Sequence, residues 1–215
     1  MSGAGPLDRG EWTVLGFTLA YLAGFTLHFL AAGNHEFLWY IVTMAALIAL
    51  VAWLSRVVSL PLALLWALTG WGLLHMAGGG VPWGDTVLYG AVLLPLVTDG
   101  EMTILRYDQA VHAYGFGVAA WLVWRLATGA VPALRGTRTA LTLAVLASMG
   151  LGAVNEMVEF AAVVALSETG VGGYVNTALD LVFNGLGAVA AVLVIAAVER
   201  RRIRAAPGRL PRSPC

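Results

Sequence analysis

The sequence has 215 residues, of which 60% are hydrophobic and 11% are charged, and its mean hydropathy is +0.83. A soluble domain of this size carries about 25% charged residues, so this composition excludes a soluble protein. The formal net charge is zero, which gives no indication of a nucleic-acid partner, and the single cysteine, Cys215, excludes a disulfide framework and a cysteine-based metal site.

Apolar stretches long enough to cross a bilayer recur along the chain, since about 20 apolar residues span the hydrocarbon core as a helix. We therefore predict an all-α, polytopic membrane helix bundle with about six transmembrane helices, at residues 12–32, 37–54, 57–76, 108–127, 139–166 and 176–198. The first stretch is too long for the apolar core of a signal peptide, so we expect an uncleaved helix. Residues 86–97, "TVLYGAVLLPLV", are too few to span and are expected to form a short re-entrant or interfacial segment.

Arginine positions test this count of helices. With six spans, Arg106 lies on one side of the membrane and the other arginines lie on the opposite side. The positive-inside rule makes that second side cytoplasmic, which predicts a multi-pass protein of a bacterial cytoplasmic (inner) membrane with both termini in the cytoplasm. We predict a single integral membrane domain over residues 1–199, followed by a basic cytoplasmic tail over residues 200–215.

Polar residues in four of the predicted helices fall at a similar depth. A helix rises about 1.5 Å per residue. If consecutive helices run in opposite directions, the following residues lie in the outer part of the membrane: His75, Asp108, His112, Glu156, Glu159, Asp180 and Asn184.

These polar residues also share helix faces, because residues three or four apart lie on one side of a helix. Asp108 and His112 form one such pair, and Glu156 and Glu159 form another. A stripe along the last helix consists of Asn176, Asp180, Asn184 and Gly187. Polar faces inside a bilayer turn toward each other or toward water, so we expect one shared polar site.

Four carboxylates in this site require compensation, because ionised carboxylates grouped in a low dielectric are strongly unfavourable. Either a cation neutralises them, or some of them hold protons. Mixed imidazole and carboxylate ligands suit a divalent Zn, Mn or Fe ion. We predict metal ligands at His75, Asp108, His112, Glu159 and Asp180, supported by Glu156, Asn184, Asn176 and Gly187.

Four segments, "LLHMAGGG", "RYDQAVHAYGFG", a Glu-containing helix and "DLVFNGLGA", resemble the bacterial inner-membrane YjdF family, which is similar to the VanZ-like membrane proteins. The resemblance covers roughly residues 60–195 and implies these shared positions: His75, Asp108, His112, Glu159, Asp180, Asn184 and Gly187. The chain departs from the family pattern at Gln109, where the family usually has Arg, and at "AYGFG", where it usually has Gln-Gly. The VanZ-like proteins are associated with glycopeptide tolerance, which points to the cell envelope and implies no reaction.

Three classes of function fit these observations. The favoured one is a metal-dependent membrane enzyme that acts on a lipid or cell-envelope precursor at the outer leaflet, where a His–carboxylate site activates water. The second is an ion- or proton-coupled carrier, although the first two predicted helices contribute almost no charge to a path across the membrane. The third is a structural or regulatory membrane protein. The expected partners are membrane lipid and this precursor; the sequence specifies neither the substrate nor the oligomeric state, and it assigns no role to Cys215.

Overall fold

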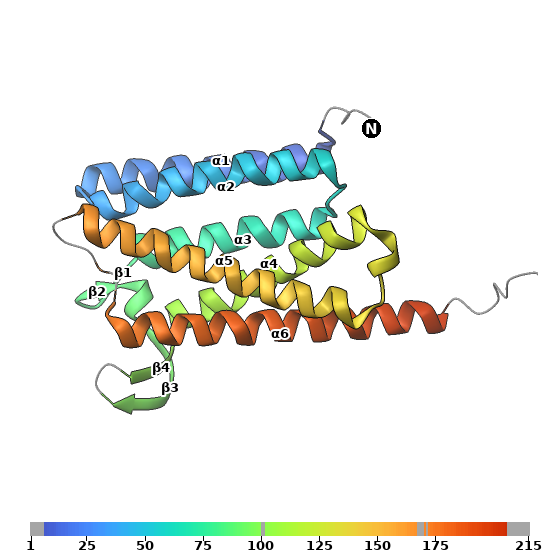
Figure 1. The fold of residues 1–215 in the computed structure, drawn as a ribbon. Helices are drawn as coiled ribbons and strands as arrows, with labels where there is room; N and C mark the ends of the chain where they lie inside the picture. Colours follow the sequence, from blue (N-terminus) through green and yellow to red (C-terminus); the bar gives the residue numbers. More distant parts are fainter. Residues whose placement is uncertain (1–6, 100–101, 167–169, 171, 206–215) are drawn as a thin grey trace, which may run out of the picture.

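Figure 1 shows the computed structural model as a bundle of long helices lying side by side, which confirms the all-α membrane fold. The structure describes residues 7–99, 102–166, 170 and 172–205. The six long helices are α1 (Arg9–Ala32), α2 (His35–Val57), α3 (Leu62–Gly80), α4 (Tyr107–Ala130), α5 (Arg138–Ala165) and α6 (Tyr174–Ala205). The shorter elements are β1 (Pro82–Trp83), β2 (Thr86–Val87), η1 (Leu88–Gly90), β3 (Val92–Asp99), β4 (Met102–Arg106) and η2 (Pro132–Leu134).

Polar and glycine residues at the helix ends explain where the helices begin and stop. Asp8 and Glu11 form a reciprocal capping box at the start of α1, and Gly33 ends this helix with a left-handed φ of 65°. The side chain of Thr137 caps α5 by accepting from the backbone N–H of Ala140. α3 begins later than the predicted residue 57 because Pro61 occupies the position just before it, where a missing N–H costs nothing.

α4 differs from the other long helices in its surroundings. By length and composition, five described helices are apolar enough to cross a membrane, namely α1, α2, α3, α5 and α6. α4 is also 24 residues long, but it carries several polar residues. It packs against α3, α5 and α6 and buries Phe116, Ala119 and Ala120. The one long helix that does not meet this criterion is therefore surrounded by three others, and the bundle can span the membrane with it inside.

The arginines of the described residues gather mainly at one end of the bundle, as the sequence predicted. Figure 1 places the start of α1 and the end of α6 at the same end. There, Arg125 Nη2 donates to the carbonyl of Ser59 at 2.9 Å, and Arg135 Nε donates to Glu199 Oε2 at 3.2 Å. Arg106 lies at the other end, just before α4. The assignment of the arginine-rich end to the cytoplasm remains a prediction.

Residues 86–97 do not form a spanning helix. They make β2, η1 and most of β3, which pairs with β4 as an antiparallel hairpin in which Val97 faces Ile104. The register is interrupted by a bulge between Val92 and Val97, and every residue of β3 is exposed. Figure 1 shows the hairpin beside the first turns of α6. The sequence did not predict strands here, and the interfacial position of this segment remains a prediction.

The C-terminal helix is longer than the sequence indicated. α6 continues to Ala205, so the first residues of the predicted basic tail are helical. Residues 206–215, which include Cys215, lie outside the described residues. The division into residues 1–199 and 200–215 remains a prediction.

Candidate metal site

The side chain of Gln109 fixes the start of α4, where two of the predicted ligands lie. The sequence analysis noted Gln109 only as a departure from the family pattern. Gln109 is 1% exposed, and its Oε1 accepts from the backbone N–H groups of Leu105 at 2.6 Å and Arg106 at 3.1 Å. Its Nε2 donates to the carbonyl of Thr103 at 3.0 Å. Leu105 has a positive φ of 72°, a strained conformation for a leucine. Gln109 therefore holds a strained turn between β4 and α4.

Close approach of α4 and α6 brings their polar faces together. A Cβ added to Gly187 would lie 1.8 Å from the carbonyl oxygen of Ala113, and one added to Gly117 would lie 3.0 Å from the carbonyl oxygen of Gly187. Only glycine allows this backbone contact. Because Asn184 and Asp180 lie one and two turns before Gly187 on the same side of α6, the contact places them against the first turns of α4.

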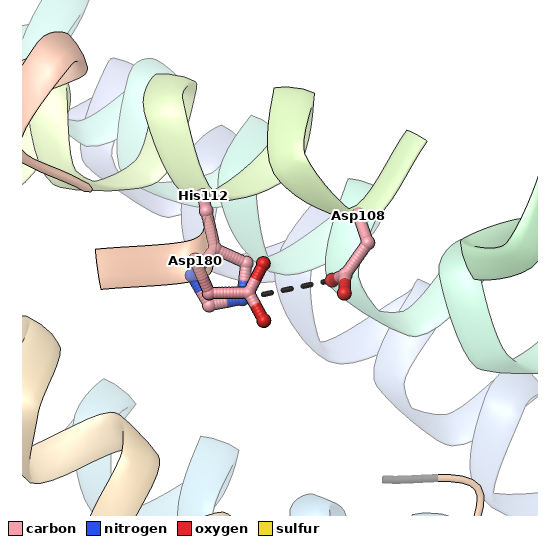
Figure 2. Close-up of side chains that lie close together, drawn as sticks. All are labelled: Asp108, His112 and Asp180. Atoms are coloured by element: carbon pink, nitrogen blue, oxygen red, sulfur yellow. Dashed lines mark ion pairs between the residues drawn. The ribbon is translucent and has the colours of Figure 1, made fainter. Parts of the chain in front are cut away.

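Asp108, His112 and Asp180 form the centre of the candidate site, and Figure 2 shows the three side chains close together, His112 and Asp108 on α4 and Asp180 on α6. One possible ligand atom from each lies within 4.8 Å of the other two. His112 Nε2 is 3.6 Å from Asp108 Oδ1. His112 and Asp180 are buried, whereas the Asp108 side chain is 19% exposed and forms the accessible edge of the site.

The proton on His112 is placed by Asn184. His112 Nδ1 lies 2.9 Å from Asn184 Oδ1, which can only accept a hydrogen bond, so Nδ1 carries hydrogen. In the neutral imidazole this leaves the Nε2 lone pair facing the carboxylate of Asp108. Fixing one ring nitrogen of a histidine so that the other is available is the usual role of a residue behind a metal ligand.

Asp180 has an incomplete set of hydrogen bonds. It is 0% exposed, and its Oδ2 accepts from Asn176 Nδ2 at 2.6 Å. The same Asn176 nitrogen is 3.4 Å from Asp108 Oδ2, so one amide lies between the two aspartates. Asp180 Oδ1 is buried and has no hydrogen-bond partner among the described residues. A buried, unpartnered carboxylate oxygen is costly, and this one belongs to the group that surrounds His112.

Glu156 and Glu159 make a second group of possible ligand atoms with His112, again within 4.8 Å of one another. Glu159 Oε1 accepts from Asn155 Nδ2 at 2.8 Å, so α5 positions one of its glutamates with its own amide. The predicted carboxylates thus fall into two groups that share His112. The sequence analysis considered Glu156 only a supporting residue, but the structure places it in the same group of possible ligand atoms as Glu159 and His112.

Compensating charge is scarce around these carboxylates. Among the described residues, the one ion pair in the cluster joins His112 to Asp108. Arg106 acts electrostatically on Asp108 and Asp180, but it makes no ion pair within 4 Å in the described part of the chain. Four carboxylates therefore face one imidazole and one more distant guanidinium.

His75 does not belong to either group of ligand atoms in the described structure. It lines a cavity of about 10 Å³ together with His112, Asn155, Trp71, Val111 and Phe116. A cavity of this size holds about one water molecule. Tyr89, a residue that the sequence analysis did not single out, hydrogen-bonds through its hydroxyl to His75 Nδ1. Burial raises the pKa of Tyr89 well above its ordinary value, so its phenol keeps its proton at neutral pH.

Comparison with protein families gives one match, which extends over residues 13–201 and is described as "Predicted membrane protein (DUF2238)". The chain belongs to this family. The match includes α4, α5, the β3–β4 hairpin and every residue of the candidate site. No curated protein and no solved structure matches the chain.

Proposed function

We propose that this membrane protein binds a divalent cation, Zn, Mn or Fe, between α4, α5 and α6, and that it uses the ion as an enzyme acting on a lipid or cell-envelope precursor in the outer half of the membrane. Asp108, His112 and Asp180 are the central ligands of the proposed ion. Glu156 and Glu159 approach the same imidazole from α5 and supply further oxygen ligands.

The observation that carries the proposal is the position of Asp180, whose buried Oδ1 has no hydrogen-bond partner among the described residues, in one group of possible ligand atoms with Asp108 and His112. The distance of 3.6 Å from His112 Nε2 to Asp108 Oδ1 also helps to choose between an ion and a shared proton. A charge-assisted hydrogen bond would bring these atoms to about 2.7–2.9 Å. Two ligand atoms bound to one tetrahedral zinc, each about 2.1 Å from the ion, are about 3.4 Å apart, so the observed spacing favours an ion.

The surroundings of the site fit water activation better than ion conduction. The neighbouring cavity holds about one water molecule and is lined by His75, His112 and Asn155. A divalent ion in such a site lowers the pKa of a bound water and makes it a nucleophile at neutral pH. Asp108, at the exposed edge, is where a substrate in the lipid would approach.

The family match supports the YjdF part of the resemblance, because DUF2238 is the YjdF family. The VanZ-like relation, and with it the cell envelope as the place of action, remains our proposal. A carrier would need polar residues that continue toward the arginine-rich end. Of the charged residues described at that end, Arg125 donates to the carbonyl of Ser59, and both Arg135 and Arg202 pair with Glu199.

The proposal is tested by the metal content and thermal stability of purified protein, for the wild type and Asp108→Asn. The substitution removes one negative charge and nearly keeps the shape of the side chain. We expect about one equivalent of a divalent metal in the wild type, and a lower content and a lower Tm in the variant. A chelator should lower the Tm of the wild type more than that of the variant, because a ligand at 100 times its Kd stabilises the folded state by about 2.7 kcal/mol.

Asp85→Asn is the matched control, since Asp85 is exposed between β1 and β2. It should change neither metal content nor Tm. If the carboxylates instead hold protons or only join helices, Asp108→Asn relieves charge repulsion. Its Tm then holds or rises, and chelator has no effect on either protein. Wild-type protein that contains no metal and is unaffected by chelator would contradict the proposal.

The enzyme part is tested by mass spectrometry of phospholipid vesicles incubated with metal-loaded wild type and with Asp180→Asn.

A further inference from the structure

The end of α3 is shaped to receive aromatic rings. A Cβ added to Gly78 would lie 2.5 Å from Cζ of Tyr89, and one added to Gly79 would lie 1.7 Å from the ring of Phe37. These glycines therefore leave space for side chains from η1 and α2. Tyr89 is held in a fixed place although it lies outside the long helices.

Tyr89 and its neighbours enclose the imidazole of His75. The ring centroids of Tyr89 and Tyr40 each lie 5.6 Å from that of His75, and the ring of Phe37 lies 6.4 Å away. Within this aromatic group, the hydrogen bond to His75 Nδ1 comes from the Tyr89 hydroxyl. His75 also lines the cavity that it shares with His112.

The direction of the Tyr89–His75 hydrogen bond follows from the hydrogens available. Nδ1 is the one partner of the Tyr89 hydroxyl in the described structure, so a phenol that accepted from Nδ1–H would leave its own hydrogen unpaired. The raised pKa of Tyr89 keeps that hydrogen in place. The phenol therefore donates to Nδ1, and the neutral imidazole carries its hydrogen on Nε2.

We infer that Tyr89 fixes His75 as a hydrogen-bond donor toward the one-water cavity beside His112, and that His75 binds the oxygen of a metal-bound hydroxide or of an anionic ligand there and is not a metal ligand. An Nε2 that carries hydrogen has no lone pair for a metal, and metal ligands must be deprotonated. The inference rests on the proposed function for the identity of the ligand. The state of the His75–Tyr89 pair does not depend on any metal.

The first measurement is nitrogen-15 NMR of histidine-labelled protein in detergent, with His75→Gln used to assign the signals. In the wild type we expect His75 to show an unprotonated Nδ1 and a protonated Nε2. Tyr89→Phe removes the donor and should shift His75 to a mixture of tautomers or to the opposite one. Tyr40→Phe is the matched control, because Tyr40 packs on the same imidazole without a hydrogen bond to it among the described residues. A protonated Nδ1 in the wild type would overturn the inference.

The second measurement separates a donor from a ligand. Cobalt-loaded protein is titrated with azide, a small anion that binds open metal positions, and followed by its visible spectrum. We expect His75→Gln to keep the full cobalt content and to bind azide about tenfold more weakly, while Tyr40→Phe behaves as the wild type. Loss of cobalt in His75→Gln would show that His75 is a ligand and would overturn the inference. If the wild type binds no cobalt, the proposed function fails, and the NMR result still decides the state of the Tyr89–His75 pair.

Discussion

His112 is contacted at both ring nitrogens, by Asn184 at Nδ1 and by Asp108 near Nε2, and the two contacts have different consequences. The amide of Asn184 sets which nitrogen carries hydrogen, whereas the carboxylate of Asp108 belongs with Asp180 to one group of possible metal ligands. A change at Asn184 should therefore act on the metal site without removing any of the proposed ligands.

Asn184→Ala tests this role. Removing a residue that orients a metal ligand usually costs 10–100-fold in metal affinity, and we expect a loss in this range together with a lower Tm. Ser148→Ala is the matched control. Ser148 is also fully buried, and its hydroxyl donates to the carbonyl of Phe116 at 2.6 Å, away from the carboxylates. It should lower stability by about 1 kcal/mol and leave metal affinity unchanged. Equal metal affinity in Asn184→Ala and the wild type would contradict the orienting role.

Gln109→Leu tests whether the hydrogen bonds of the buried Gln109 side chain stabilise the turn between β4 and α4. The substitution keeps the volume but removes the three hydrogen bonds that tie Thr103, Leu105 and Arg106 to α4. We expect a loss of about 2–4 kcal/mol in unfolding free energy, measured by chemical denaturation in mild detergent. Leu105→Gly should partly restore the stability of the Gln109→Leu protein, because glycine adopts a positive φ without strain. A Gln109→Leu protein as stable as the wild type would show that Gln109 does not stabilise the turn between β4 and α4.

Charged residues of the site were easy to identify from the sequence because a carboxylate or imidazole in an apolar helix is expensive and stands out. Gln109 and Tyr89 were not identified. Gln109 is a neutral side chain whose partners are backbone groups of a hairpin, and Tyr89 reaches His75 from a short turn after β2. Both depend on the folding of residues 86–106, which has no helical period. The metal-binding role of the predicted residues remains a prediction.

Helices were predictable as elements because bilayer thickness fixes their length, and the observed bounds agree with the predicted ones to within a few residues at most ends. The β3–β4 hairpin was not predictable in the same way. An apolar run of this length fits a buried strand, a short helix or an interfacial segment, and periodicity alone does not distinguish them. The sequence did carry one hairpin signal, the pair Asp99-Gly100 just before the strand partner Met102–Arg106, but the sequence analysis did not use it.

Because α4 and α6 are in close contact, we expect Gly187 and Gly185 of α6 to respond differently to substitution by alanine. Gly187→Ala would place a Cβ 1.8 Å from the carbonyl oxygen of Ala113, so the helices must separate. We expect a loss of about 1–3 kcal/mol in unfolding free energy, together with weaker metal binding because Asp180 moves away from His112.

Gly185→Ala is the control for this pair of helices. The nearest atom to its added Cβ is the flexible end of Met149, at 3.6 Å, so the change should be neutral or stabilising by up to about 1 kcal/mol. Both variants are compared by denaturant unfolding and by metal content. Equal unfolding free energies for Gly187→Ala and Gly185→Ala would show that the close approach of α4 and α6 does not require glycine at position 187.

The surface of the whole molecule is apolar around the bundle. Large side chains such as Leu27, Trp53, Leu146, Phe160 and Leu193 are between 59% and 68% exposed, and they lie on four different long helices. A water-soluble protein does not expose apolar residues on this scale, so lipid is the solvent for these faces. The polar side chains are concentrated inside, around α4. The arrangement is that of a membrane bundle with an apolar surface, a largely apolar core and a group of buried polar side chains beside α4.

Orientation in the membrane follows from the arginines, and it decides which leaflet the candidate site faces. The start of α1, the α4–α5 connection and the end of α6 share one end of the bundle, while Arg106, Asp108 and the β3–β4 hairpin lie at the other. The positive-inside rule predicts that the first end faces the cytoplasm. A reporter that is active only in the cytoplasm should therefore be active when fused after Cys215. A reporter that is active only after export should be active when inserted between residues 100 and 101. The reverse pattern would move the site to the inner leaflet and remove the argument for a substrate in the outer leaflet, while leaving the geometry of His112 and its carboxylates unchanged.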